Sequence, residues 1–303
     1  MRIFKPSYKA SAIIAALLLA GLLCVGYGYF IEPRRLVIRH EELAIKNWEP
    51  AFNGLRIAMI GDIHGGSNGA DAAKLREMVA RVNAENVDLI VLLGDYVSQH
   101  HSTIPISESD LRMPVADVAD NIAGMKARYG VLAVLGNHDG WFSDEKVSAE
   151  LTRVGYRVLE NDLITIEQNG KRLRVIGLPD HLKVGSWEAF AADARTVASP
   201  TEGIGDLIVL EHGPDILPHV TGDNAISSDL KLMLCAHTHG GQVWLPILGR
   251  PIIPSSYGQK YAYGHVYDRG VDMWVTAGIG TSILPFRFMV PPEITVLTVK
   301  SSS

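Results

Sequence analysis

Short apolar runs alternate with amphipathic helical patterns along most of the chain after residue 55. The first runs are nearly continuous in Val, Ile and Leu, which is typical of strands buried on both faces. They are LRIAMIGDIH at 55–64, VDLIVLLGDYV at 87–97 and VLAVLGNHD at 131–139. Between the first two runs, Leu75, Met78, Val79 and Val82 recur at the spacing of one helix face. This alternation predicts an α/β layered domain.

The second half of the chain continues the pattern. Val115, Val118, Ala119, Ile122 and Met125 predict a further helix, and Ser143 is suited to cap the next one. Later strands are predicted for LRVIGLPD, DLIVLEHGPD, LKLMLCAHTHGG, MWVTAGIG and ITVLTVK, which span residues 173–180, 206–215, 230–241, 273–280 and 294–300. The apolar segment ILPFRFMVPP at 283–292 is expected to pack in the core, with lipid contact as the alternative. Since no break divides this region, we expect one domain over 55–300, preceded by a linker at 33–54.

The N-terminal segment carries no charge from Ala10 to Ile31. About 20 apolar residues in a helix span a bilayer core of ~30 Å, so the segment predicts a membrane anchor over residues 1–32. A cleaved signal peptide is the alternative. The length of the run, and the bulky Tyr27, Tyr29 and Phe30 at its end in place of a small-residue cleavage site, favour an uncleaved helix. Basic residues flank both sides, so the sequence does not decide the membrane orientation.

Composition excludes some kinds of site. The 303 residues carry a formal net charge of −5, so a nucleic-acid partner, which usually meets a basic face, is not expected. Cys24 and Cys235 are the two cysteines, and no CxxC pair is present, which excludes a thiolate zinc knuckle.

Polar residues of metal-binding type follow five of the predicted strands. The clusters are Asp62-x-His64, Gly94-Asp95, Gly136-Asn137-His138-Asp139, His212 and His237-x-His239. Because sites in open α/β sheets lie beyond the carboxyl ends of the strands, the clusters would converge if these strands share one sheet. Carboxylate, amide and imidazole ligands favour Mn²⁺, Fe or Zn²⁺ in an open site. The number of ligands predicts two ions, with one carboxylate bridging them.

These five blocks, in this order, resemble the calcineurin-like metallophosphoesterases over roughly residues 55 to 300. AHTHGGQ and the tail GIGTSILPFRFMVPPEI are most similar to the membrane-associated YkuE/YaeI-type subgroup, which is related to UDP-2,3-diacylglucosamine hydrolases. One departure is Ala236, where the family usually has Gly. The resemblance implies a layered β-sandwich flanked by helices, here preceded by one transmembrane helix.

The resemblance also implies roles for residues. Asp62, His64 and His239 would bind the first metal, Asn137, His212 and His237 the second, and Asp95 would bridge them. His138 would stabilise the transition state or protonate the leaving oxygen, and Asp139 would orient His138. Arg287 is expected to meet a substrate phosphate or to form a structural salt bridge.

The resulting hypothesis is a membrane-anchored phosphodiester or pyrophosphate hydrolase that uses a metal-activated hydroxide. Two Mn²⁺ ions are the preferred cofactor, with Fe, Zn²⁺ or Mg²⁺ as alternatives. The expected partner is a phosphorylated small molecule or a lipid-linked substrate such as UDP-2,3-diacylglucosamine. A broad-specificity envelope phosphodiesterase and a non-catalytic scaffold of the same fold are the alternatives. The expected location is a bacterial inner membrane, with the side of the catalytic domain left open.

Overall fold

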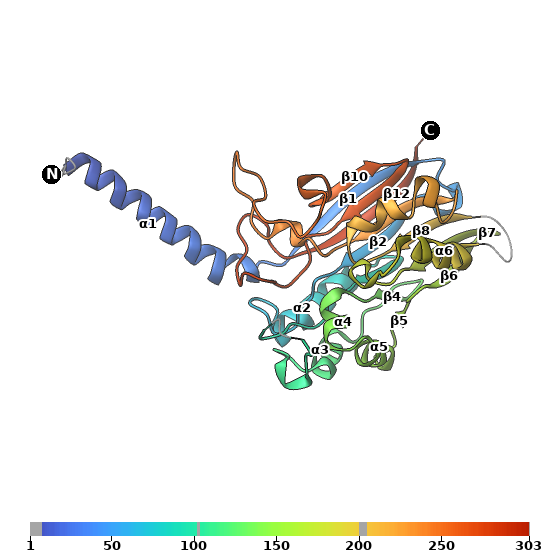
Figure 1. Ribbon diagram of the computed structural model, residues 1–303, viewed down its shortest axis with the longest axis horizontal. Coiled ribbons are helices and arrows are strands. Elements are labelled where there is room, and N and C mark those ends of the chain that lie inside the picture. The colour runs from blue at the N-terminus through green and yellow to red at the C-terminus, as the bar shows by residue number, and fades with distance from the viewer. Residues whose placement is uncertain (1–7, 102–103, 200–204, 303) are drawn as a thin grey trace.

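The computed structural model describes residues 8–101, 104–199 and 205–302, and consists of one long N-terminal helix followed by a layered domain (Figure 1). The helices are α1 (Tyr8–Phe30), α2 (Ala72–Ala84), α3 (Val115–Ile122), α4 (Asn137–Phe142), α5 (Asp144–Arg153) and α6 (Trp187–Ala198). The strands β1 to β6 span Val37–Lys46, Leu55–Ile60, Leu89–Leu93, Val131–Val134, Arg157–Val158 and Asp162–Gln168. The strands β7 to β12 span Lys171–Gly177, Asp206–Leu210, Leu230–Cys235, Gly264–Asp268, Val271–Val275 and Glu293–Ser302.

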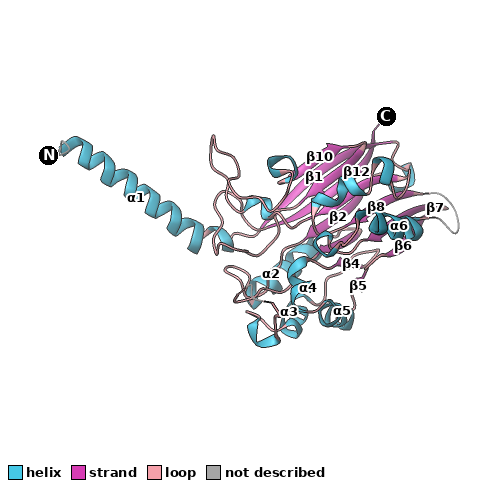
Figure 2. Cartoon of the chain, viewed as in Figure 1, coloured by secondary structure: helices cyan, strands magenta, loops and turns pink. Residues whose placement is uncertain are grey.

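The strands form two six-stranded sheets (Figure 2). The first sheet has the order β1-β12-β2-β3-β4-β5, in which β12 runs antiparallel to β2 and the run from β2 to β5 is parallel. The second sheet has the order β10-β11-β9-β8-β7-β6, with a parallel centre and antiparallel pairs at both edges. The prediction that the motif-bearing strands are buried is confirmed, but these strands are divided between two sheets, in each of which they run parallel.

Three apolar layers hold the domain together. The central layer lies between the sheets, where residues such as Ile57 and Val91 meet Ile208 and Leu232. A second layer joins the first sheet to α2, α3 and α5, and a third joins the second sheet to α6. The order helix, sheet, sheet, helix therefore agrees with the expected layered β-sandwich flanked by helices.

The helix predictions agree with the structure at most positions. Leu75, Met78 and Val82 of α2 are buried, and the Ser143 side chain accepts a hydrogen bond from the backbone N–H of Lys146 at the start of α5. Helix α3 ends earlier than the apolar stripe suggests, because Gly124 adopts a φ of 85° just after its last turn.

Residues 33–54 do not form a simple linker. Residues 37–46 are strand β1, which pairs in parallel with β12 at the edge of the first sheet, and Leu43, Ile45, Trp48 and Phe52 are buried in the central layer. The sequence pattern missed this strand because only its second half alternates buried and exposed residues.

Helix α1 extends away from the domain, with apolar side chains exposed along most of its length (Figure 1). It is the one helix in the described part of the chain that is long and apolar enough to cross a membrane. Its C-terminal end is bonded to the domain, since the Arg287 backbone N–H donates to the Gly28 carbonyl at 3.0 Å.

If β1 is an integral strand, removing one of its buried side chains must destabilise the whole domain. Leu43→Ala is expected to lower the free energy of unfolding by about 2–4 kcal/mol, the usual cost of such a truncation in a core. Urea unfolding of the detergent-solubilised protein, followed by tryptophan fluorescence, measures this change. Glu42→Ala, at the neighbouring exposed position, is the control and should change stability by under about 0.5 kcal/mol. Equal, small effects of both substitutions would restore the linker interpretation.

Candidate metal centre and active site

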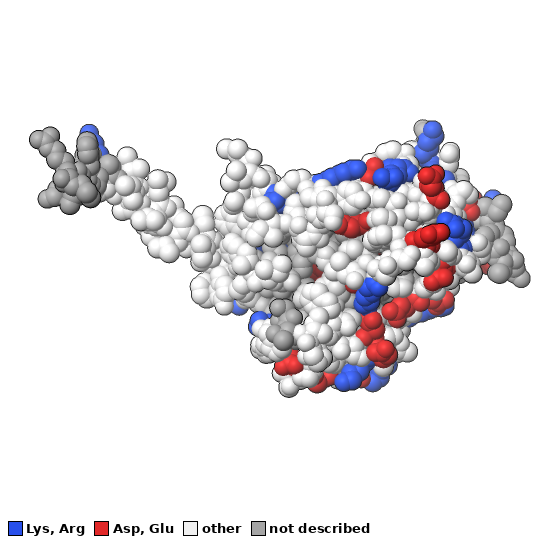
Figure 3. All heavy atoms as spheres, in the orientation of Figure 1, with Lys and Arg blue, Asp and Glu red and all other residues white. Residues whose placement is uncertain are grey.

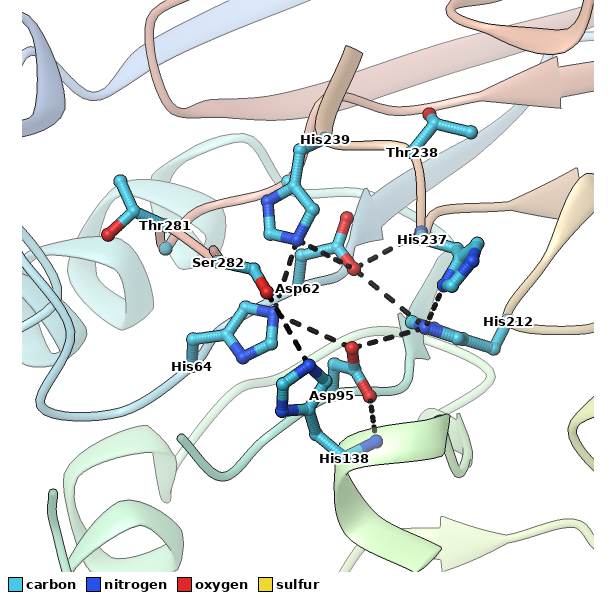
Figure 4. A network of polar contacts seen from close by, with 12 residues as sticks. Asp62, His64, Asp95, His138, His212, His237, Thr238, His239, Thr281 and Ser282 are labelled. Carbon is cyan, nitrogen blue, oxygen red and sulfur yellow. Dashed lines mark hydrogen bonds and ion pairs between the residues drawn. The ribbon is translucent and has the colours of Figure 1, made fainter. Parts of the chain in front are cut away.

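The strand-end clusters predicted from the sequence converge where the two sheets meet (Figure 4). Asp62 and His64 follow β2, Asp95 follows β3, and Asn137 begins α4 directly after β4. These come from the first sheet, whereas His212 follows β8, and His237 and His239 follow β9, in the second sheet. The site thus depends on the packing of one sheet against the other.

The backbone bends sharply at these residues. Asp62, His64, Asp95, His237 and His239 all have φ values between 44° and 68°. This left-handed region is uncommon for residues other than glycine, and its occurrence at functional sites reflects strain that the surrounding fold maintains. These turns point successive polar side chains inward from the end of each strand.

Glycines leave the room that these turns need. A Cβ on Gly136 would lie 2.3 Å from Asp95 Oδ1, and one on Gly278 would lie 2.6 Å from the Asp62 Cβ. The Ala236 methyl, which replaces the family's usual glycine, is accommodated in the same way. A Cβ on Gly61 would lie only 2.4 Å from that methyl, so Gly61 provides its space.

The first set of expected ligands gathers around Asp62. The Nε2 atoms of His64 and His239 are 3.2 Å apart, and His239 Nε2 lies 3.8 Å from Asp62 Oδ1. The His64 Nδ1–H donates to the Val97 carbonyl at 3.2 Å, so the lone pair of Nε2 points into the site. One ligand atom from each of these three residues falls within a 4.8 Å group.

The second set gathers around His212. Its Nδ1–H donates to the Leu93 carbonyl at 2.7 Å, which turns Nε2 toward His237 Nδ1 at 3.1 Å. Asp95 lies between the two sets, because its Oδ2 is 3.3 Å from His212 Nε2 and 3.5 Å from His64 Nε2. Asn137 is buried, and its Oδ1 has no hydrogen-bond partner.

The protonation of these residues is set by burial and by their neighbours. Burial, followed by the charge of His138, lowers the pKa of His64 to about 3, and burial together with His212 lowers the pKa of His237 to about 3. Burial and Asp95 raise the pKa of Asp62 to about 7. Burial also opposes protonation of His212, but the Asp95 carboxylate outweighs it and raises the pKa of that imidazole.

The donor set fits divalent cations. The neutral imidazole is the form that binds metal; burial favours it at His64 and His237, whereas a cation at His212 would replace the proton that Asp95 stabilises there. Asp62 Oδ2 and Asn137 Oδ1 are buried oxygens without a partner. The imidazole nitrogens of His64 and His239 face each other closely, as do those of His212 and His237. Cations between these atoms would satisfy the lone pairs and the orphaned oxygens together.

His138 lies beside the ligands and faces the cavity. Its Nδ1–H donates to Gln99 Oε1 at 2.5 Å, and its Nε2 lies 3.4 Å from Ser282 Oγ. The indole of Trp141 packs against the imidazole, with ring centroids 4.5 Å apart. Sequence reasoning missed Gln99, whose only signal was its place in the polar loop that follows Gly94-Asp95.

Asp139 does not contact the His138 side chain. Its buried carboxylate accepts hydrogen bonds from the backbone N–H groups of Gly136, Asp95, Tyr96 and Val97, at 2.8–3.3 Å. The expectation that Asp139 orients His138 is therefore replaced by another role. Asp139 fixes the loop that presents Asp95.

Arg287 does not line the cavity, and its expected contact with a substrate phosphate is wrong. The side chain is fully buried behind His239, and its guanidinium donates to the carbonyls of Ala277, Gly278, Gly280 and Val290. Nor does it form the alternative salt bridge among the described contacts. It instead stabilises the turn after β11 and the loop that returns to β12.

A second polar cluster, formed by Asp180, His181 and Glu211, lies next to the His212 and His237 pair. His181 Nδ1 is 3.3 Å from both Asp180 Oδ1 and Glu211 Oε1. Burial opposes protonation of His181, but Glu211 and Asp180 outweigh it and raise its pKa to about 10. A protonated His181 therefore balances part of the negative charge of Asp180 and Glu211 within the cluster. The sequence signalled only Asp180, as an acid at a strand end.

A cavity of about 640 Å³ opens above the ligands, a size typical of small-molecule sites. Its floor includes Asp95, Asn137, His138, His237 and His239, and His100, His101 and Arg112 stand at its polar side. Its apolar wall is formed by Trp141, Leu182, Val243, Ile252, Pro254, Ile283 and Leu284. The cavity is therefore lined by both polar and apolar side chains.

Comparison with known proteins agrees with this geometry. The family model described as "Calcineurin-like phosphoesterase" matches residues 55–241. The chain is 29% identical to the metallophosphoesterase YkuE of Bacillus subtilis, covering 96% of this chain and 95% of that protein. It is 28% identical to the phosphodiesterase YaeI of Escherichia coli, covering 90% and 91%.

A transmembrane protein with a metallophosphoesterase domain from Danio rerio is 25% identical, over 96% of this chain and 63% of that protein. The family match covers more than half of the chain and includes each of the strand ends that carry an expected ligand. The chain therefore belongs to the calcineurin-like phosphoesterase family and is a phosphoester hydrolase.

Proposed function

We propose that this protein is a membrane-anchored phosphodiesterase that depends on two divalent cations and acts on a phosphodiester or pyrophosphate bond. The observation that carries the proposal is the meeting of two ligand sets on opposite sides of one buried carboxylate, that of Asp95. A single ion would leave about half of these ligand atoms unused, whereas two ions would engage both sets.

The metal ligands divide by position. Asp62, His64 and His239 would hold one ion, Asn137, His212 and His237 would hold the other, and Asp95 would reach both. Mn²⁺ suits this mixture of carboxylate, amide and imidazole ligands, and Fe, Zn²⁺ or Mg²⁺ are the alternatives. When bound, the pair of ions supplies Lewis acidity toward phosphoryl oxygens and lowers the pKa of water, so that water attacks phosphorus near neutral pH.

The chain itself supplies proton transfer and positioning. Gln99 holds the Nδ1–H of His138, so that Nε2 points into the cavity. A proton on Nε2 would pass to the leaving oxygen as its bond to phosphorus breaks. Gln99 is then a positioning residue and His138 the catalytic residue.

The cavity supports a substrate with both a charged and an apolar part. Arg112 and His100 line the cavity and would contact a further phosphate or a sugar of the substrate. They would thus take the substrate-binding role that was expected of Arg287. The apolar wall would receive a lipid part, as in UDP-2,3-diacylglucosamine. The apolar helix α1 would anchor the domain to the membrane, which in bacteria would be the inner membrane. If the substrate is a nucleotide-linked lipid, the catalytic domain must lie on the cytoplasmic side.

A broad-specificity envelope phosphodiesterase is the second candidate. The similarity to YaeI, which is described as a phosphodiesterase without a particular substrate, supports this candidate. The scaffold alternative is not favoured, since all seven expected ligands and His138 are present.

The substrate is tested by the release of UMP from UDP-2,3-diacylglucosamine by the detergent-purified protein. We expect release with Mn²⁺ and none with excess EDTA, and we expect Mn²⁺-dependent cleavage of bis-p-nitrophenyl phosphate in parallel. Cleavage of the chromogenic diester alone would select the envelope phosphodiesterase. Metal binding without turnover of either substrate would contradict an enzymatic role.

The bridging role of Asp95 predicts a joint loss of metal and activity. Asp95→Asn is expected to reduce bound Mn²⁺ from two ions per chain to one or none, and to reduce turnover by roughly 10³-fold or more, because the neutral amide cannot bridge two cations. Inductively coupled plasma mass spectrometry measures the ions, and the chromogenic diester reports turnover. Two tightly held ions in the variant would exclude the bridge.

His138 and Gln99 should affect catalysis without affecting metal content. His138→Ala is expected to lose roughly 10²–10⁴ in kcat, the usual contribution of acid–base help. Gln99→Ala should lose about 10-fold, as expected when a positioning residue is removed. The deficit of both variants should shrink with a p-nitrophenyl ester, whose leaving oxygen needs little protonation. A parallel loss of bound metal in His138→Ala would show that His138 is a ligand.

A further inference from the structure

Two loops expose large apolar side chains beside the cavity. One loop carries Trp244, Ile247 and Leu248, and the other carries Ile283, Leu284 and Met289; together these six residues are called the apolar rim. Ile247 is fully exposed, and Ile283 is 82% exposed. Single exposed apolar residues are ordinary, but a cluster of this size marks a surface that meets an apolar partner. Residues 283–292 therefore do not all pack in the core, the expectation preferred from the sequence, because Ile283, Leu284 and Met289 are exposed whereas Arg287 and Val290 are buried.

The rim is a continuous structure. The backbone N–H of Trp244 donates to the Phe288 carbonyl at 2.9 Å, and the Gln242 side chain donates to the Ser282 and Leu284 carbonyls. The two loops are thus bonded to each other at their bases.

The backbone at the rim is unfavourable for its side chains. Ile247 and Ile283 have φ values of 75° and 62°. A β-branched residue is a clear outlier in this region, where glycine or asparagine would be more stable. Isoleucine at these two exposed positions contributes nothing to the described core, which points to contact with something outside the chain.

The rim is fixed to the end of α1. The ring of Tyr27 packs edge-on against Phe288, with centroids 6.3 Å apart. The Asn68 amide donates to the carbonyls of Tyr29 and Pro285, both at 2.8 Å. Both loops lie on the side of the domain from which α1 leaves (Figure 1). Figure 3 shows this end of the domain mainly without charge, whereas charged side chains gather over the end away from α1.

The length of α1 indicates where the apolar rim would lie relative to a bilayer. Its 23 residues rise about 35 Å, slightly more than a bilayer core of ~30 Å. The contacts with the rim are made at Tyr27, Gly28 and Tyr29, in the last helical turns. If α1 crosses a bilayer, the rim must therefore lie at the boundary between headgroups and acyl chains, where aromatic and apolar residues are most stable.

The rim also leads into the active site. Ile283 and Leu284 belong both to the rim and to the apolar wall of the cavity, whose floor holds His237 and His239. We propose that the apolar rim rests in the surface of the bilayer that α1 crosses, so that the cavity takes the lipid part of its substrate directly from the membrane. This inference rests on the proposed function in that α1 serves as a membrane anchor.

The proposal is tested by fluorescence quenching on the full chain in vesicles of phosphatidylethanolamine and phosphatidylglycerol. Ile247→Cys and Ile283→Cys, each in a Cys24→Ser background, are labelled with an environment-sensitive NBD dye; Cys235 is buried and stays unlabelled. Thr165→Cys, exposed on β6, is the matched control. We expect doxyl-labelled lipids to quench both rim probes at least 2-fold and to leave the control unchanged.

Rim probes that are quenched no more than the control would overturn the proposal. Disulfide-linked dimers of Ile247→Cys without lipid quenching would overturn it in favour of self-association.

A second variant separates this proposal from the proposed function. Ile247→Ser combined with Leu248→Ser changes rim residues that do not line the cavity. We expect unchanged turnover of soluble bis-p-nitrophenyl phosphate and at least 10-fold slower turnover of UDP-2,3-diacylglucosamine presented in vesicles. Equal turnover of the vesicle substrate would refute delivery through the rim. If the unaltered protein cleaves neither substrate, the proposed function fails, while the quenching result still decides the position of the rim.

Discussion

Burial of ionisable side chains without enough hydrogen-bond partners is the constraint on which this structure depends. Asp62, Asp95, His64 and His212 are almost inaccessible to solvent, and buried oxygens of Asp62 and Asn137 have no partner. Burying such groups is unfavourable unless opposite charge meets them. The Asp95 and His212 pair provides part of that charge, and divalent cations among the ligands would provide the rest. The rest of the fold therefore holds these groups together although burying them next to one another is energetically unfavourable.

The fold does so at the ends of strands. Five of the expected ligand residues adopt left-handed backbone conformations, which the buried strands behind them can enforce. Asp139 and Arg287 contribute from behind the site, because their buried side chains bind the backbone of the turns and leave the cavity to other residues. The positions of the expected ligands thus depend on the backbone of these turns. Apolar packing between the two sheets keeps the residues from the first sheet next to those from the second.

Much of this arrangement could be predicted from the sequence. Continuous apolar runs followed by Asp, Asn and His located the strands and the polar clusters that converge in the site, since both signals are local, and the family resemblance selected the seven expected ligands among them. Other features depend on contacts between distant segments. β1 was missed because β12, more than 250 residues later, provides its pairing. The roles of Asp139 and Arg287 depend on which backbone groups lie next to their side chains. The exposure of Ile283 depends on the path of its loop. A pattern of residues along the sequence contains neither kind of information.

The central claim is that two cations share Asp95 in this site. The most direct measurement is an anomalous difference map from crystals of the protein grown with Mn²⁺. The account predicts two peaks about 3.5–4 Å apart on either side of the Asp95 carboxylate, one beside His64 and one beside His212. A single peak, or a second ion held by the Asp180, His181 and Glu211 cluster in place of the Asn137 side, would contradict it.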